Sequence, residues 1–199
     1  MCFNIPIIKK EIIKLNLEKL RIRRIGDSFS SLLKDNSSIL DIGCGNGNLG
    51  EYLILNKNIF YHGVDIIKNK NLSNITFTKS SFPYPFEDKS FDTVIIILTL
   101  HHFDNPENGL KEAVRLAKNN ILLLEDVPRN NLERNLMKLI DFIGNKWVSK
   151  DIPIPFNFYS DEIWQSLFIK YKLKLKSRKK VFPLPFPRLN HYLYELILE

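Results

Sequence analysis

The chain has 199 residues, of which 44% are hydrophobic and 26% charged, and 29 basic residues against 22 acidic ones give a formal net charge of +7. This composition is typical of a globular protein and excludes a disordered or fibrous chain. At this length we expect a single domain over residues 1–199, with a core large enough to need no disulfide or metal for its stability.

The first 35 residues predict a basic helical segment. Apolar residues recur in it at helical spacing: Ile8, Ile12, Leu15 and Ile22. Gly26-Asp27-Ser28 should interrupt this helix, so we expect a second short helix over residues 29–33. Residues 3–35 therefore form an N-terminal helical segment that precedes the rest of the fold.

Strands and helices alternate over residues 36–126. The expected strands are residues 38–42, 59–65, 75–79, 91–98 and 121–125, and the expected helices are residues 49–55 and 107–118. This alternation predicts an α/β fold with a parallel sheet and right-handed crossovers. Strand 91–98 is almost continuously apolar, as expected of a central strand covered on both faces.

Residues 127–199 predict further helices followed by a hairpin. The helices are expected over residues 132–148 and 160–169, with Ser160 as the N-cap of the second. A proline- and phenylalanine-rich connection over residues 151–159 joins them. Residues 171–176 alternate between apolar side chains and lysine, and a proline-rich turn then leads to a last strand at 191–198. We expect the two strands to pair as an antiparallel hairpin at one side of the sheet.

The glycine loop at residues 41–50, Asp-Ile-Gly-Cys-Gly-Asn-Gly-Asn-Leu-Gly, is the most informative segment. It follows a strand and opens a helix, so its backbone N–H groups are available to a ligand. Two interpretations compete. The spacing Gly45-x-Gly47-x-x-Gly50, with Asp65 about 20 residues further on, matches a dinucleotide-binding fingerprint. The spacing Asp41-x-Gly43-x-Gly45-x-Gly47 instead places an acidic residue before alternating glycines.

Four motifs in order decide between them: Leu-Asp-Ile-Gly-Cys-Gly-Asn-Gly at 40–47, Gly-Val-Asp at 63–65, Pro-Phe-Glu-Asp-Lys-Ser-Phe-Asp at 85–92 and Leu-His-His-Phe at 100–103. With them the chain resembles the class I S-adenosylmethionine (SAM)-dependent methyltransferases, in the small-molecule branch similar to quinone-biosynthesis C-methyltransferases. The resemblance implies a Rossmann-like, mostly parallel seven-stranded sheet with an antiparallel last strand and helices on both faces. Residues 36–126 would be the SAM-binding core, and residues 127–199 the helices and the C-terminal hairpin.

The same resemblance implies how the methionine and ribose parts of SAM are held. Asp41 would hold the amino group, directly or through water. Gly43 and Gly45 would contact the methionine part through their backbone, and Asp65 would accept hydrogen bonds from both ribose hydroxyls. A carboxylate at a strand end beside a glycine loop is also where open α/β sheets bind ligands.

Further positions are implied around the adenine ring and the end of the central strand. Ile66 would lie against adenine, and Leu98 would border the cofactor where strand 91–98 ends. Ser80 and Ser81 stand where the family often has Asp-Ala, so the hydrogen bond to adenine should be weaker. The family's Gly-Gly turn before the fifth strand is replaced by Lys118-Asn119-Asn120, and we expect a turn there as well.

Methyl transfer from a sulfonium needs alignment of the two reactants more than it needs a nucleophile or a metal. His101 and His102 follow the central strand and are candidate general bases for an acceptor that must lose a proton. A packing or hydrogen-bonding role is the alternative for both.

The acceptor is less well defined by the sequence. The fourth strand is followed by Leu98-Thr99-Leu100-His101 and not by the Asn/Asp-Pro-Pro-Tyr/Phe signature of enzymes that methylate amino groups of DNA and glutamine, which favours a small-molecule acceptor. Basic clusters at residues 9–24 and 170–180 predict solvated faces, with nucleic acid or a membrane surface at the basic N-terminal helix as alternatives. An RNA methyltransferase and a non-catalytic SAM-binding regulatory protein are the alternative functions.

The two cysteines, Cys2 and Cys44, form no disulfide framework and no metal-ligand spacing. Such sparse cysteine usage favours a reducing compartment. Because no apolar stretch reaches the length of a membrane span, we expect a cytoplasmic protein.

Overall fold

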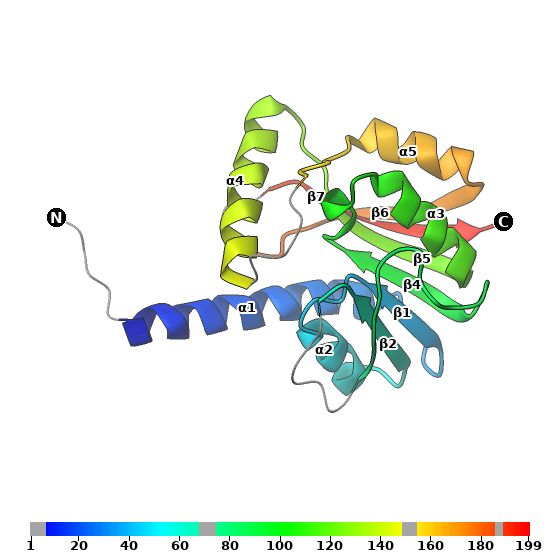
Figure 1. Ribbon diagram of the computed structural model, residues 1–199, viewed down its shortest axis with the longest axis horizontal. Helices are drawn as coiled ribbons and strands as arrows, with labels where there is room; N and C mark the ends of the chain where they lie inside the picture. The colour runs from blue at the N-terminus through cyan, green and yellow to red at the C-terminus, as the bar shows by residue number, and fades with distance from the viewer. Residues whose placement is uncertain (1–6, 68–74, 149–154, 186–188) are drawn as a thin grey trace.

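The structure is a computed structural model that describes residues 7–67, 75–148, 155–185 and 189–199, with the backbone alone for residues 7–14 and 144–148 (Figure 1). Three predictions fall partly outside the described residues: the start of the N-terminal helix at residue 3, the first part of the connection 151–159 and the end of the proline-rich turn. Cys2 also lies outside them.

A sheet of seven strands in the order β3-β2-β1-β4-β5-β7-β6 forms the centre of the fold. Its strands are β1 Ser38–Ile42, β2 Phe60–Asp65, β3 Thr76–Lys79, β4 Phe91–Ile97, β5 Ala117–Asp126, β6 Leu173–Val181 and β7 His191–Leu198. Neighbouring strands among β1–β5 pair in parallel, and β7 pairs antiparallel with both β5 and β6. The mostly parallel sheet with an antiparallel last strand is therefore confirmed.

Helices cover both faces of the sheet (Figure 1). They are α1 Ile7–Ser30, α2 Asn48–Asn56, the single 3-10 turn η1 Leu100–His102, α3 Pro106–Leu116, α4 Asn131–Val148 and α5 Asp161–Lys170. Side chains of α1 and α2 share one core cluster, and those of α3 and α5 share the other. The sheet thus separates two hydrophobic layers.

Strand β4 is buried on both faces, as its apolar sequence predicts. Val94 and Ile96 pack into the layer of α3 and α5, whereas Ile95 between them packs into the layer of α1 and α2. All three side chains are fully buried. The two-residue period of a strand sends alternate side chains to opposite faces, so β4 links the two layers.

The expected break in the N-terminal helix is wrong, because α1 continues through Gly26 to Ser30. A Cβ at Gly26 would lie 2.3 Å from Cδ1 of Tyr52 on α2. Glycine is therefore needed for the close approach of two helices and does not end α1. The Ser28 hydroxyl donates to the Arg24 carbonyl one turn earlier (2.9 Å), which keeps this polar residue within the helix.

The expected turn at Lys118–Asn120 is also wrong, because β5 already begins at Ala117. Asn120 pairs with Thr93 of β4, and the Thr93 hydroxyl donates to Asn120 Oδ1 at 2.8 Å. This side-chain bond across the two strands extends β5 toward its amino end. Asn120 thus serves strand pairing where a turn was expected.

The strand order reverses between β1 and β4, so the loops that follow these strands diverge at the carboxyl edge of the sheet. Open α/β sheets bind ligands in the crevice outside such a point, between the loops that follow the two strands. Helix α4 lies beside this edge. The amino-terminal half of α1 extends past the sheet and lies below α4 in the view of Figure 1. Within the described parts of the chain, no helix is long and apolar enough to cross a membrane.

Candidate active site at the carboxyl edge of the sheet

The glycine loop after β1 adopts a left-handed backbone at Gly43, Gly45 and Gly47, with φ of 73°, 57° and 73°. At Gly43 the loop also approaches the end of β4, because a Cβ there would lie 2.2 Å from Cγ2 of Thr99. At Gly45 a Cβ would meet no atom within 4 Å. Gly45 therefore borders open space, and Gly43 is enclosed by protein.

Asp65, the last residue of β2, holds the loop in place. Its Oδ2 accepts from the Gly45 N–H at 2.8 Å, and its Oδ1 accepts from the Ile67 N–H at 3.0 Å. A carboxylate offers about four lone-pair sites, so these two bonds leave acceptor capacity on each oxygen. Asp65 is thus able to receive two further donors from a ligand beside Gly45.

Asp41, near the end of β1, is only 2% exposed. The Tyr61 hydroxyl donates to its Oδ2 at 2.5 Å, whereas its Oδ1 has no hydrogen-bond partner among the described residues. Burial raises the pKa of Asp41 to about 7, with the Tyr61 bond acting against it and the charge of Asp65 adding to it. A buried carboxyl group with an unused acceptor is suited to a ligand that brings a cationic donor.

A surface cavity of about 400 Å³ lies where β2 and β3 end, lined by Ile66, Lys79, Ser80 and Ser81. Ile66 keeps 44% of its surface exposed, so an apolar face is available to a flat ligand. A larger hollow of about 520 Å³, lined by Asp35 and residues 54–59, lies at the amino ends of β1 and β2. We place the ligand site at the smaller cavity, because parallel sheets bind ligands at their carboxyl edge.

Leu98, directly after β4, adopts a left-handed backbone with φ of 51°. This conformation is uncommon for a residue with a branched side chain and is often found at functional sites. The Leu98 N–H donates to the Leu124 carbonyl of β5 at 2.8 Å. The left-handed backbone at Leu98 kinks the chain before Thr99, whose side chain contacts the glycine loop. η1 begins directly after Thr99.

His101 and His102 both lie in η1, which Glu125 of β5 holds in place. Glu125 Oε1 accepts from the N–H groups of Thr99 and Leu100 at 2.9 and 2.6 Å, and its Oε2 lies 2.7 Å from His101 Nδ1. Because an ionised carboxylate only accepts, Nδ1 carries the proton in this bond. Glu125 therefore fixes both the backbone of η1 and the orientation of the His101 ring.

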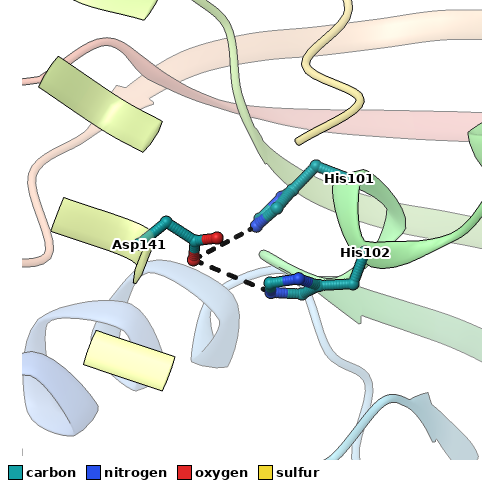
Figure 2. A group of neighbouring side chains, drawn as sticks. All are labelled: His101, His102 and Asp141. Atoms are coloured by element: carbon teal, nitrogen blue, oxygen red, sulfur yellow. Dashed lines mark ion pairs between the residues drawn. The ribbon is translucent and has the colours of Figure 1, made fainter. Parts of the chain in front are cut away.

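Asp141 of α4 faces both histidines (Figure 2). Its Oδ1 lies 3.6 Å from His101 Nε2 and 3.7 Å from His102 Nε2. Burial lowers the pKa of His101, but the charges of Glu125, Asp141 and Asp126 outweigh burial and hold that pKa well above its ordinary value. A proton on His101 disfavours a general-base role for this residue and leaves His102 as the candidate.

A second ion pair lies at the end of β5, which neighbours β7. Asp126 ends β5 and pairs with His191 Nδ1 at the start of β7. Burial raises the pKa of Asp126, but the hydrogen bond and charge of His191 outweigh burial and lower it overall. Asp126 therefore stays ionised beside the crevice.

Helix α1 contacts the glycine loop. Glu18 accepts from the side-chain amides of Asn46 and Asn48 at 2.9 and 2.8 Å, which joins α1 to the glycine loop. Burial lowers the pKa of Arg21, while the charges of Asp126, Glu18 and Asp141 act in the opposite direction. Arg21 therefore lies within electrostatic reach of these three acids.

The structure brings all predicted cofactor residues to the ends of β1, β2, β3 and β4, and both predicted histidines to the adjoining η1. Sequence reasoning missed Glu125 and Asp141, which surround the histidines, and Glu18 and Arg21, which come from α1. In the sequence, Glu125 ends an apolar strand, and Asp141 lies on a helix whose apolar spacing marks its other side chains. No local motif marks either acid.

Comparison with known proteins identifies the fold and its cofactor. Residues 40–124 match the family model described as a methyltransferase domain. The chain carries a class I SAM-dependent methyltransferase domain. The match favours the SAM interpretation of the glycine loop over the dinucleotide one, and the contacts of the loop with SAM stay a prediction.

Two curated relatives of this methyltransferase domain are described as tRNA methyltransferases. The chain is 31% identical over 187 residues to the tRNA (carboxymethyluridine(34)-5-O)-methyltransferase of Xenopus tropicalis, covering 80% of this chain and 28% of that protein. A protein of the same description from Macaca fascicularis is 34% identical over 100 residues, covering 45% of this chain and 14% of its own length. The chain thus spans less than a third of these relatives, and neither supports the narrower resemblance to quinone-biosynthesis enzymes.

Solved structures agree on the fold. A SAM-dependent methyltransferase from Thermotoga maritima superposes with a TM-score of 0.67 at 19% identity, covering 96% of both chains. The 1,6-didemethyltoxoflavin-N1-methyltransferase of Burkholderia thailandensis, solved with S-adenosylhomocysteine, has a TM-score of 0.66 at 13% identity and covers 89% of this chain and 78% of its own. At these identities the similarity shows the fold alone.

Proposed function

We propose that this domain transfers a methyl group from SAM to an acceptor bound between the glycine loop, η1 and α4. The observation that carries the proposal is the pairing of open space at Gly45 with the unused acceptor atom of buried Asp41. The ammonium group of SAM would supply the missing donor to Asp41 Oδ1. Its positive charge would also favour the ionised form of this carboxyl group.

The remaining cofactor contacts follow from this position. Asp65 would accept from the ribose hydroxyls with the lone pairs that Gly45 and Ile67 leave unused. Ile66 would pack on one face of adenine, with Ser80 and Ser81 at its edge in the cavity. Leu98 would border the methionine part, because the kink after β4 directs the chain toward the glycine loop.

SAM supplies an electrophilic methyl group when it is bound, so the protein's own residues mainly align the acceptor and exclude water. His102 is the candidate to remove a proton from an acceptor that carries one. Glu125 and His101 would act as positioning residues. Glu125 holds the backbone of η1 and the His101 ring, and the His101 ring packs beside the His102 ring, with centroids 4.2 Å apart.

We propose a tRNA nucleoside as the acceptor. The match to the Xenopus tropicalis relative covers 80% of this chain, whereas the family model covers residues 40–124 alone. It therefore includes segments outside the cofactor-binding core, from which the acceptor site of this fold is built. The net charge of +7 supports the association of the domain with a polyanion.

A small-molecule acceptor is the second candidate, favoured by the acidic side chains Glu18, Asp126 and Asp141 at the crevice. These carboxylates would repel a phosphate group and attract a cationic or neutral molecule. The nucleoside proposal is compatible with them only if the tRNA phosphates lie on basic surfaces outside the crevice.

The test is transfer of a labelled methyl group from SAM by the full chain, offered total tRNA or a protein- and RNA-free metabolite extract. We expect ribonuclease-sensitive label in the tRNA sample, and loss of label with Asp65→Ala. Label in the metabolite extract alone would replace the tRNA proposal with the small-molecule one. Binding of SAM without label in either sample would support a non-catalytic regulatory protein.

A further inference from the structure

We propose that His101, His102 and Asp141 bind one first-row divalent transition-metal cation at the acceptor side of the crevice. The three side chains come from two elements, η1 and α4, and point toward a common centre (Figure 2). One ligand atom from each lies within 4.8 Å of the other two. The proposal concerns these residues alone and does not depend on the identity of the methyl acceptor.

The spacing of the three groups is close to that of a coordinated ion. Asp141 Oδ1 lies 3.6 and 3.7 Å from the Nε2 atoms of His101 and His102, beyond ordinary hydrogen-bond length. Ligand atoms about 2.0–2.1 Å from a tetrahedral ion lie about 3.3–3.4 Å apart. Small rotations of the side chains would therefore bring all three into contact with one ion.

A second observation points to a missing ligand at the same place. The His101 side chain is only 2% exposed, yet its Nε2 has no hydrogen-bond partner among the described residues. Buried polar atoms are normally satisfied, so an orphaned ring nitrogen calls for a partner. With the Nδ1 proton directed at Glu125, it is the second ring proton, on Nε2, that a cation would displace, and Nε2 would then ligate the ion at the cluster.

Glu125 gives the His101 ring the arrangement found around metal-bound histidines. Such histidines usually donate their other ring N–H to a carboxylate, which fixes the tautomer and increases the basicity of the ligating nitrogen. Glu125 does this at 2.7 Å and is itself fixed by two backbone N–H groups. The stacking of Phe158 on His101, with centroids 4.9 Å apart, restricts the ring further.

The charges around the cluster favour a cation. Glu125, Asp126 and Asp141 lie on its sides, and Arg21 and His191 are the basic groups from neighbouring elements that face these acids. Two imidazoles and one carboxylate suit zinc, cobalt, iron or manganese better than magnesium, which prefers oxygen ligands. An ion with three protein ligands retains open positions toward the crevice. If the proposed function holds, an acceptor oxygen would bind there, and the ion would replace His102 as the group that favours loss of the acceptor proton.

The test is a titration of the full chain with Co²⁺ after treatment with a chelator and dialysis, followed by calorimetry and visible absorption. We expect one equivalent of Co²⁺ to bind and to give the absorption bands of a nitrogen- and oxygen-coordinated ion. His102→Asn and Asp141→Asn should each weaken binding at least tenfold. His62→Asn is the matched control. His62 on β2 forms a hydrogen bond with Thr78 on β3, outside the cluster, so this variant should leave the Co²⁺ affinity unchanged.

Two outcomes would overturn the metal site. One is the absence of stoichiometric Co²⁺ binding to the wild-type chain, which would leave an ion pair between His101 and Asp141 as the explanation of the cluster. The other is Co²⁺ binding that survives in His102→Asn and Asp141→Asn. Thermal unfolding of each variant confirms that it folds. Binding of S-adenosylhomocysteine to the metal-free chain, measured in parallel, separates a failure of this site from a failure of the proposed function.

Discussion

The cofactor side and the acceptor side of the crevice are built in different ways. The cofactor side uses short segments at the ends of adjacent strands, and its principal contacts, such as Gly45 to Asp65, join two neighbouring strand ends. The acceptor side assembles Glu125 from β5, the histidines of η1, Asp141 from α4 and Arg21 from α1. The first depends on local backbone geometry, and the second depends on how two helices pack against the sheet edge.

This difference separates the part of the domain that would bind the cofactor from the part that would select the acceptor. Under the proposed function, a backbone loop and the carboxylates of Asp41 and Asp65 would recognise the constant ligand, SAM. A network of titratable side chains would face the variable ligand, the acceptor. Substitutions on the cofactor side should therefore act through conformation, and those on the acceptor side through charge and hydrogen bonding.

The largest effect is expected for Gly43→Ala on the cofactor side. The new Cβ would have to form in a left-handed backbone and would lie 2.2 Å from Thr99. Left-handed backbone costs about 1–2 kcal/mol for an ordinary residue, and overpacking adds about 1–3 kcal/mol. We expect the free energy of unfolding in urea to fall by about 2–5 kcal/mol.

Gly45→Ala is the matched control, since its φ of 57° is similar but its Cβ would meet no atom within 4 Å. Its free energy of unfolding should fall by about 1–2 kcal/mol only, from the backbone cost. Equal losses for the two variants would show that the close approach to Thr99 does not matter for the loop.

On the acceptor side, Glu125→Gln should lower the free energy of unfolding by about 1.5–3 kcal/mol, the range for hydrogen bonds to charged groups. The amide would present a donor to His101 Nδ1, or lose its bonds to the backbone of η1. Denaturant unfolding measures the effect, with Glu87→Gln at an exposed position as the control. An unchanged unfolding free energy would mean that Glu125 does not hold η1.

The pH dependence of SAM binding tests Asp41. Its folded pKa of about 7 is raised above the ordinary value of 3.8, so its contribution to stability is present at low pH and is lost as the pH rises through about 7. A cationic ligand needs the ionised form, so SAM affinity should be about tenfold lower at about pH 6 than at about pH 8. Calorimetry of the wild-type chain and Asp41→Asn checks this, and the variant should lack the pH-dependent step. The same step in both proteins would assign it to another group.

The sequence predicts the sheet and the cofactor side well, because strand periodicity and the glycine spacing are local signals. The prediction from sequence fails where a residue contacts another residue that is distant in the chain. Gly26 suggests a helix end, but it permits the packing of α1 on Tyr52 of α2. Asn120 suggests a turn, but it bonds to Thr93 on the adjacent strand.

The acceptor side shows the same limit more strongly. Asp141 is 40 residues from His101 in the sequence, and only the placement of α4 beside the sheet edge brings it within 3.6 Å. The partners of a helix's polar face are set by tertiary packing, which a single sequence does not encode as a local pattern. The histidine pair was therefore predictable as a candidate, but the carboxylates on either side of it were not.

The most direct test of the account is calorimetric titration of the full chain with S-adenosylhomocysteine, compared with Asp65→Ala. The account predicts one binding site in the wild-type chain and a ten- to hundredfold weaker affinity in the variant, equivalent to the loss of about 1.5–3 kcal/mol of hydrogen bonding to a charged group. Equal affinity in the two proteins, or no binding to the wild-type chain, would contradict it.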